Sequence, residues 1–212
     1  MSELKHFSLS DIQSFDRLYR MNMINSISGY KPANLIGTYS EKGNANLSII
    51  TSVVHLGSDP ALIGYIQRPV SELSHTYKNI IKNKHYSINH VHEDFIEKAH
   101  YTSAKFDEGI SEFEACGLTE ESIREFHAPF VKQSKVKIGL KHVREIPIDL
   151  NNTILMIGQI EHIFIEKNAI LKDGSINLNL VNDVCVSGLD TYHKVNRIKT
   201  FPYAKVQSIP NL

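Results

Sequence analysis

The chain has 212 residues, with 23 basic and 23 acidic side chains and no formal net charge at pH 7. Hydrophobic residues make up 42% of it and charged residues 22%, proportions typical of a globular protein with a core of its own. Because the charge is balanced and no basic stripe with interleaved aromatic residues is present, the sequence argues against nucleic acid or an anionic membrane as a partner.

The start of the chain and its cysteines bear on location. The first residues, MSELKHFSLSDIQSF, lack a cationic start followed by an apolar core, which argues against a signal peptide. No apolar run is long enough to span a bilayer. Cys116 and Cys185 are isolated thiols, which suit a reducing compartment. We therefore expect a cytoplasmic protein with one domain over residues 1–212.

Hydrophobic periodicity and turn residues predict the secondary structure along the chain. Ser71 is a plausible cap for the second expected helix, and Thr119 opens an apparent capping box for the fourth. The expected helices cover residues 10–28, 70–82, 93–101 and 119–126, and the expected strands cover 32–40, 47–54, 61–67, 85–91, 135–148, 153–166 and 184–189.

The order of these elements indicates the fold class. Strands are joined by short turns, and helices are inserted between them rather than alternating with them, which favours an antiparallel barrel over a doubly wound sheet. The strand at 61–67 is expected to extend the hairpin formed by 32–40 and 47–54. Gly158 inside a long strand predicts a bulge or a barrel corner. The expected fold is mainly β, a six-stranded antiparallel Greek-key barrel with peripheral helices.

Hydroxyl groups in an apolar strand provide the first functional signal. Ser48, Thr51 and Ser52 lie among Leu, Ile and Val, and a buried hydroxyl without a partner costs about 1–3 kcal/mol. Arg68 and the start of the following helix offer a permanent cation and unpaired N–H groups, which suit a phosphate. In the structural alternative, Ser71 caps the helix, Arg68 is solvated and Thr51 bonds to backbone. Spacing alone leaves both interpretations open.

Other chemistries find little support in the sequence. His90 and His92 alternate on one strand without a nearby cysteine or carboxylate at ligand spacing, so we expect no metal site. The two cysteines form no C-x-x-C pair. Phosphate-binding P-loops, dinucleotide fingerprints and nucleophile elbows are absent from the sequence as well.

Several segments together resemble a known family. Residues 43–68, GNANLSIITSVVHLGSDPALIGYIQR, followed by SHTYKNI at 74–80 and HYSINHV at 85–91, resemble the flavin reductase-like family of FMN-binding split barrels. The resemblance covers roughly residues 24–193. Ala61 departs from it, since the family carries a second proline there.

Two later segments resemble one branch of that family. They are SEF at 111–113 with GL at 117–118, and GLDTYH at 188–193. A second departure lies at 30–32, where Tyr-Lys-Pro replaces the Pro-Arg-Pro of many members. This leaves open whether Lys31 meets the ligand.

The resemblance implies a function and a set of partners. It implies an FMN-dependent oxidoreductase most like an NAD(P)H:flavin reductase, in which NADH or NADPH is the transient co-substrate and hydride passes to flavin N5. It further implies a homodimer with FMN at the subunit interface, small-molecule substrates, and a partner oxygenase as one destination for reduced flavin. The alternatives are an FMN-binding carrier or redox sensor with little turnover, and a barrel that has lost its ligand.

The resemblance and the hydroxyl pattern also select site residues. His193 is the first candidate for a catalytic side chain, although the first hydride transfer requires no acid or base. The expected cofactor-binding residues are Asn46, Leu47, Ser48, Ile49, Ile50, Thr51, Ser52, Arg68, Ser74, His75, Thr76, Lys78 and Tyr192.

Overall fold

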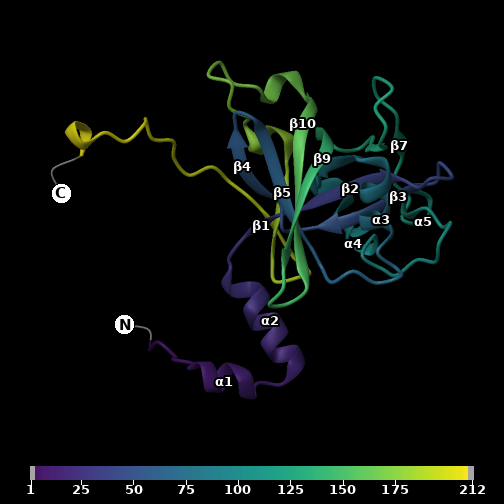
Figure 1. Ribbon diagram of the computed structural model, residues 1–212. Coiled ribbons are helices and arrows are strands. Elements are labelled where there is room, and N and C mark those ends of the chain that lie inside the picture. Colours follow the sequence, from purple (N-terminus) through teal and green to yellow (C-terminus); the bar gives the residue numbers. More distant parts are fainter. Residues whose placement is uncertain (1–2, 210–212) are drawn as a thin grey trace.

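The computed structural model describes residues 3–209 and is built around a seven-stranded antiparallel sheet with strand order β3-β2-β6-β9-β10-β5-β4 (Figure 1). The connection from β5 to β6 passes over β10 and β9, a crossover typical of Greek-key topology. The strands of this sheet are β2 (Asn34–Tyr39), β3 (Ala45–Ile50), β4 (Val54–Ser58), β5 (Ala61–Gln67), β6 (His85–His90), β9 (Val136–Ile148) and β10 (Thr153–Ile165).

Two smaller sheets and several short helices surround the main sheet. Within residues 3–209, no helix combines the length and the apolar character that crossing a membrane requires. The smaller sheets comprise β1 (Lys31–Pro32), β11 (Val184–Ser187) and β12 (Thr191–Lys194), and β7 (Glu120–Glu121) with β8 (Phe130–Val131). The helices are α1 (Leu9–Ser14), α2 (Arg17–Ile27), α3 (His75–Asn83), η1 (Glu93–Phe95), α4 (Ile96–Tyr101), α5 (Glu112–Ala115), η2 (Lys167–Ala169), α6 (Leu178–Val181) and η3 (Val206–Ser208).

The expected mainly-β antiparallel fold is confirmed, with one more strand in the main sheet than the six expected. The extra strand arises because the expected strand at 47–54 divides: β3 ends at Ile50, and Val54 begins β4. The expectation that strand 61–67 extends the β2–β3 hairpin is wrong. Instead, β5 pairs with β4 and β10, while β3 forms the opposite edge of the sheet.

The N-terminal helix is also divided where the sequence predicts one element. The expected helix begins at residue 10, whereas α1 is capped by Ser8, whose side chain forms a capping box with Asp11. Phe15 then adopts extended backbone, and the Asp16 carboxylate accepts the N–H groups of the first turn of α2. A second strong cap inside the apolar pattern therefore starts a new helix.

Two further helix predictions need correction. The helix expected at 70–82 begins only at His75, and Ser71 is not its N-cap, since Ser74 takes that position. The helix expected at 119–126 is absent: β7 in this segment pairs with β8. Arg124 and Glu125 have φ angles of 53° and 56°, a left-handed conformation that a right-handed helix does not contain.

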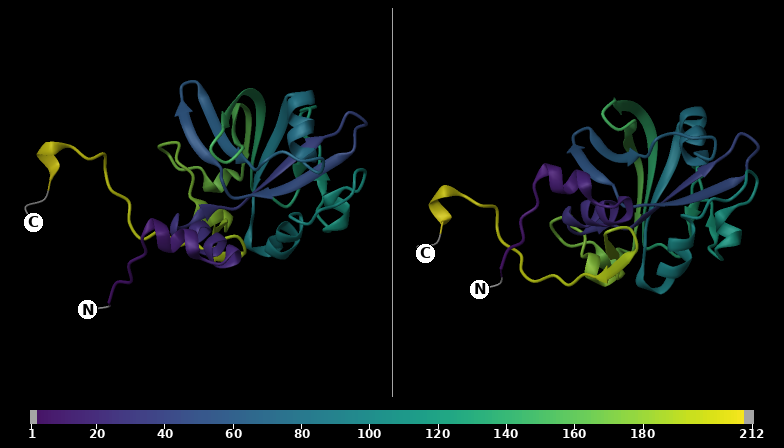
Figure 2. Two further views of the ribbon diagram at one scale, coloured as in Figure 1. Left: turned by 60° about the horizontal axis from the view of Figure 1, so that its bottom comes forward. Right: turned by 90° about the horizontal axis from the view of Figure 1, so that it is seen from below.

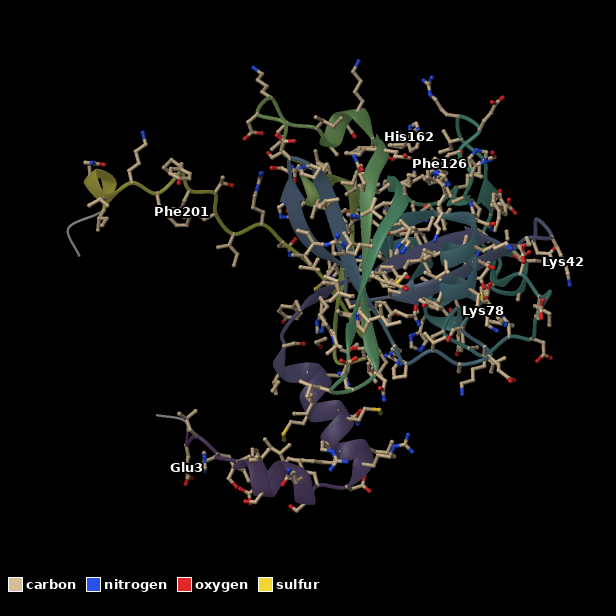
Figure 3. The ribbon with its side chains drawn as sticks, in the orientation of Figure 1. Glu3, Lys42, Lys78, Phe126, His162 and Phe201 are labelled. Carbon is tan, nitrogen blue, oxygen red and sulfur yellow. The ribbon has the colours of Figure 1, made fainter. Side chains whose placement is uncertain are left out.

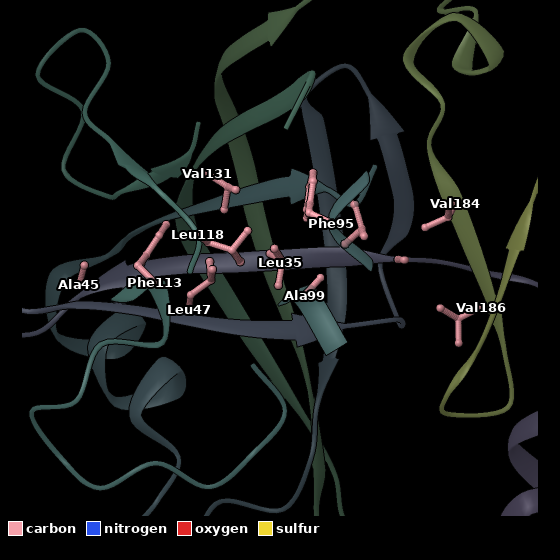
Figure 4. Close-up of a cluster of buried hydrophobic side chains, with 12 residues drawn as sticks. Leu35, Ala45, Leu47, Phe95, Ala99, Phe113, Leu118, Val131, Val184 and Val186 are labelled. Atoms are coloured by element: carbon pink, nitrogen blue, oxygen red, sulfur yellow. The ribbon is translucent and has the colours of Figure 1, made fainter. Parts of the chain in front are cut away.

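Alternation along β2 separates two hydrophobic cores. Leu35 packs in a first cluster with Phe95, Phe113 and residues of β11 (Figure 4), whereas the neighbouring Ile36 packs in a second cluster. Successive side chains of a strand project to opposite faces, so a single strand contributes to both clusters. The second cluster includes Tyr86, whose ring lies against Gly158 of β10. The register shifts beside this glycine, which confirms the expected bulge.

The other face of β4, β5, β10 and β9 carries many apolar side chains, and the structure covers only one end of it. A loop containing Phe126, Ala128 and Phe130 covers the end of this face near Phe164. Pairing register places the remaining side chains on the same face, since directly opposed residues project together. This outer sheet face carries eight apolar side chains, all half-buried or exposed: Val54, Leu56, Leu62, Ile66, Ile146, Ile148, Leu155 and Ile157. The same register places Lys141, Arg144, Thr153 and Gln159 on this face as well.

Candidate functional site

Strand β3 presents its polar residues to a cavity and its apolar residues to the core. Ala45, Leu47 and Ile49 pack in the first hydrophobic cluster. The alternate residues Asn46, Ser48 and Ile50 line a cavity of about 190 Å³. Residues 46–52 were all expected to bind the cofactor. Because successive side chains of a strand project to opposite faces, only alternate residues of β3 reach the cavity.

Helix α3 points its N-terminus at this cavity. The first helical hydrogen bond of α3 runs from the Lys78 N–H to the Ser74 carbonyl, 3.1 Å. The N–H groups of His75, Thr76 and Tyr77 precede that bond, and all three residues line the cavity. Ser74 places no side-chain hydrogen bond on the helix end, because its hydroxyl accepts the Ser71 N–H instead, 2.9 Å. The helix end therefore offers N–H donors and a partial positive charge to an anion.

A buried hydroxyl at the cavity also lacks a partner. Tyr65 of β5 is 1% exposed and lines the cavity, and its Oη forms no hydrogen bond with the described residues. Burial is the main cause that raises the pKa of this phenol well above its ordinary value, so the group remains a neutral donor. An unpaired buried hydroxyl is costly, which points to a bound molecule that accepts a hydrogen bond from it.

A carboxylate from a distant segment closes another side of the cavity. Glu112 of α5 is buried, and its Oε2 accepts the Leu47 N–H at 2.8 Å. That N–H belongs to edge strand β3. Burial raises the pKa of the Glu112 carboxyl, and the hydrogen bond from the Leu47 N–H and the electrostatic effect of the nearby His75 side chain act in the opposite direction. The segment from Thr102 to Phe106, which includes the cation of Lys105, completes the wall.

A second pocket of about 240 Å³ adjoins the cavity. Asn46 and His75 line both, so the two spaces meet beside the first turn of α3. The second pocket carries Lys42, Lys78 and Lys82, and Figure 3 shows Lys42 and Lys78 on the same side of the molecule. The Nζ of Lys78 donates to the Glu72 carbonyl at 2.7 Å.

The structure thus brings together about half of the expected cofactor-binding residues. Asn46, Ser48, Ile50, Ser74, His75 and Thr76 line the cavity, and Lys78 lines the adjoining pocket. Among them, the Asn46 side-chain amide donates to Thr76 Oγ1 at 2.9 Å, which links β3 to α3.

The remaining expected residues lie elsewhere. Leu47 and Ile49 face the core, Thr51 follows the end of β3, and Arg68 is exposed beyond the end of β5 without lining the cavity. Ser52 uses its hydroxyl within the protein: Oγ donates to the Ile66 carbonyl at 3.2 Å and accepts the Ile66 N–H at 3.1 Å.

Tyr192 and His193 lie on β12 of the small sheet, outside the lining of the cavity. The Tyr192 hydroxyl contacts His100 Nδ1 at 3.2 Å, and burial raises its pKa to about 12. His193 Nε2 contacts Ser187 Oγ at 2.8 Å, and its ring packs edge-on against Tyr30. His193 therefore has no access to the cavity within one chain.

Sequence reasoning missed Tyr65, Gln67, Glu112 and the segment 102–106 as lining residues. Tyr65 and Gln67 are two residues apart on β5 and project to the same face of the sheet. Placing one of them at the cavity would therefore have identified the other. Glu112 belongs to the SEF segment at 111–113. Its position next to a core aromatic residue was the one feature of the sequence that could have indicated a buried carboxylate. Segment 102–106 has no comparable pattern.

The cavity suits a molecule with a flat apolar part and an anionic end. Apolar walls come from Ile36, Ile50 and Leu73, and polar edges come from Asn46 and Ser48. Donors converge at the start of α3, and Tyr65 supplies an unmatched hydroxyl. Flavin nucleotides combine these features, so the residues present fit a cofactor of this kind. The fold and the cavity define an antiparallel barrel protein with a cavity between an edge strand and a helix N-terminus.

Comparison with known proteins identifies the family. A flavin reductase-like domain matches residues 30–178, and the chain belongs to this family. A crystal structure from Shewanella frigidimarina NCIMB 400, of a protein assigned as a flavin reductase with a split barrel domain, superposes with a TM-score of 0.91 at 44% identity. That alignment covers 94% of this chain and 100% of the other. The expected membership of a split-barrel flavin reductase-like family is confirmed.

More distant structures share the fold. Nitrilotriacetate monooxygenase component B from Bacillus cereus aligns with a TM-score of 0.82 at 16% identity, over 95% of this chain and 100% of that one. Among curated sequences, an uncharacterized protein of Aquifex aeolicus (strain VF5) is 27% identical over 152 residues, which cover 70% of this chain and 75% of the relative.

Proposed function

We propose that this protein binds FMN and acts as an NAD(P)H:flavin reductase. Family membership supports a flavin as cofactor or substrate. The observation that carries the choice of FMN is the cavity, where the start of α3 meets a wall containing the unpaired Tyr65 hydroxyl. Bound flavin would supply a hydride acceptor at N5.

In this proposal the chain's residues position the cofactor. The N–H groups of His75 and Thr76 bind the phosphate, and the polar residues of β3 line the ring system and the ribityl chain. Lys105 in the cavity and Lys78 in the adjoining pocket add positive charge. Tyr65 would donate a hydrogen bond to the flavin and stay protonated.

We also propose a homodimer with the flavin site at or near the subunit interface. The uncovered outer sheet face supports a dimer, because exposed apolar side chains grouped on one face are typical of a protein interface. Arg68, Tyr192 and His193, which do not line the cavity within one chain, are candidates to complete the site of the second copy. An oxygenase that consumes reduced flavin is a proposed partner, since a monooxygenase component has the same fold.

Titration of apo-protein with FMN, FAD and riboflavin tests the cofactor assignment. We expect flavin fluorescence to be quenched on binding, with FMN bound more tightly than riboflavin because only FMN carries the phosphate. His75→Pro, which is tolerated in a first helical turn but removes one N–H donor, is expected to reduce the FMN preference. Equal affinity for FMN and riboflavin would contradict a phosphate site at α3.

Anaerobic stopped-flow mixing tests the reductase assignment. The FMN-loaded protein is mixed with NADH and, separately, with NADPH, while flavin absorbance is followed. We expect NADH, NADPH or both to reduce the bound flavin, which is observed as a loss of flavin absorbance after mixing. If neither does, the reductase proposal is wrong, and an FMN-binding electron carrier remains as the function.

A further inference from the structure

Both ends of the chain leave the body of the protein as arms. The N-terminal arm comprises α1 and α2, and the C-terminal arm comprises residues 195–209. Figure 1 shows the two arms projecting away from the sheet, and the turned views in Figure 2 show both extending to the same side of the body. Neither α1 nor α2 contains a buried residue.

Hydrogen bonds to the body fix the direction of each arm at its root. Lys31 Nζ donates to the Asn25 carbonyl of α2 at 2.9 Å and to the Gly188 carbonyl at 2.7 Å. Asn179 holds the C-terminal arm on both sides: its Nδ2 donates to the Val195 carbonyl at 2.6 Å, and its Oδ1 accepts the Arg197 N–H at 3.1 Å. The arms are therefore directed outward by defined contacts.

The arms carry large apolar side chains that their own chain leaves uncovered. In α2, Leu18 and Ile27 are 62% and 73% exposed. In the C-terminal arm, Ile198, Phe201 and Tyr203 are 99%, 72% and 88% exposed, and Figure 3 shows Phe201 well clear of the body. Exposed apolar side chains grouped in this way mark an interaction surface.

The outer sheet face provides a matching surface within the same chain. It carries eight apolar side chains across four adjacent strands, and Leu56 and Leu155 approach each other over Gly64. The C-terminal arm has 15 residues and can reach about 50 Å when extended. Seven strands span only about 30 Å. An arm rooted on one barrel is therefore long enough to cross the sheet of another.

We propose that the arms of each copy lie on the outer sheet face of a second copy, so that two chains exchange their arms. This inference rests on the homodimer in the proposed function and specifies which segments form its interface. A second copy is the occupant that the chain itself supplies: each copy has one set of arms and one uncovered face, so a two-fold pair covers both sets at once and closes the assembly.

Cross-linking between labelled and unlabelled copies tests the exchange directly. A photoreactive benzoylphenylalanine replaces Phe201 in the full chain, and equal amounts of ¹⁴N and ¹⁵N protein are mixed, allowed to exchange and irradiated. We expect cross-linked peptides of mixed isotope that join the arm to residues 54–67 or 144–157. Cross-links confined to peptides of one isotope would show that the arm folds onto its own chain and would overturn the proposal.

Sedimentation of substituted full-length protein tests the energetic role of the arm. The double variant Phe201→Ser/Tyr203→Ser is expected to raise the dimer dissociation constant at least tenfold. Tyr101→Ser is the matched control, because Tyr101 is 59% exposed on α4, outside both arms and the outer face, and its dissociation constant should not change. An unchanged dissociation constant in the double variant would overturn the proposal.

FMN titration of the same samples separates this inference from the proposed function. A wild-type protein that binds FMN but shows no inter-chain cross-link contradicts the arm exchange alone. Inter-chain cross-links in a protein that binds no flavin contradict the proposed function and support the exchange.

Discussion

At the scale of single residues, Gly158 shows how one missing side chain permits the packing of the second core. A Cβ atom at this position would lie 2.8 Å from Tyr86 Cζ and 3.1 Å from Leu140 Cδ2, and would also contact the phenol oxygen. Tyr86 is fully buried, so its ring has little room to move. We expect Gly158→Ala to lower the free energy of unfolding by about 1–3 kcal/mol through overpacking.

Urea unfolding followed by circular dichroism measures this effect. Gly57→Ala is a suitable control, because the nearest atom to its added Cβ is the Pro60 carbonyl oxygen at 3.4 Å, an ordinary contact. If the two variants lose the same free energy of unfolding, then the general effect of replacing glycine in a strand, rather than contact with Tyr86, accounts for the loss at Gly158.

Glu112 is expected to make stability depend on pH. Burial raises the pKa of this carboxyl in the folded protein above its ordinary value of 4.5. The folded state therefore holds the proton more tightly than the unfolded state, and the stability contributed by the protonated carboxyl is lost as pH rises through the folded pKa. Glu112→Gln removes this titration while its amide oxygen still accepts the Leu47 N–H.

The measurement compares free energies of unfolding in a pH series. The difference, wild type minus Glu112→Gln, is expected to fall as pH increases above 4.5. Glu114 is exposed on the same helix, and Glu114→Gln is the control. Its free energy of unfolding is expected to depend on pH in the same way as that of the wild type. A difference that is constant or rises with pH would contradict the raised pKa.

At the scale of elements, the bend between β3 and β4 is held by one hydroxyl. Ser52 bonds to both the N–H and the carbonyl of Ile66, which ties the bend to β5. We expect Ser52→Ala to lower the free energy of unfolding by about 1–3 kcal/mol, because two backbone groups lose their partner. Flavin affinity should stay the same, and Ser52→Thr should restore stability; a loss of affinity with unchanged stability would instead indicate a ligand contact.

Most elements were predictable because their signals are local. Hydrophobic pattern and turn residues identified β2, β6, β9 and β10, and Gly158 correctly predicted a bulge. Boundaries failed where a local signal competed with another: Asp16 starts a second helix inside an apolar pattern, and the bend at 51–53 interrupts an apolar run. The pairing of β5 with β10 depends on contacts about 90 residues apart, which no local pattern encodes.

The site was predictable to the same extent. The strand hydroxyls and the start of the following helix lie within one continuous stretch of sequence. Ser48 and Thr76 could therefore be predicted as parts of one site. Glu112 reaches the Leu47 N–H across 65 residues, and only the folded chain brings them together. The polar alternation of β3 was visible in the sequence, but which face met the core depended on α5 and β11 packing against it.

At the scale of the whole molecule, flavin binding is expected to raise the free energy of unfolding of the whole domain. The cavity is formed by β3, β5, α3, the 102–106 segment and α5, which are distant in sequence. Unfolding any of them destroys the site, so a ligand that binds only the folded state raises the free energy of unfolding by RT ln(1 + [L]/Kd). At a free FMN concentration one hundred times its dissociation constant, the gain is about 2.7 kcal/mol.

Denaturant unfolding at several FMN concentrations measures this linkage. Total protein is held constant, because the proposed dimer would make the midpoint depend on protein concentration. Riboflavin at the same free concentration should stabilise less, since it lacks the group that we place at the start of α3. The FMN gain should follow the logarithm of its concentration above the dissociation constant. An FMN-independent midpoint, in a protein whose cavity residues are intact, would mean that the cavity between β3 and α3 does not hold the cofactor.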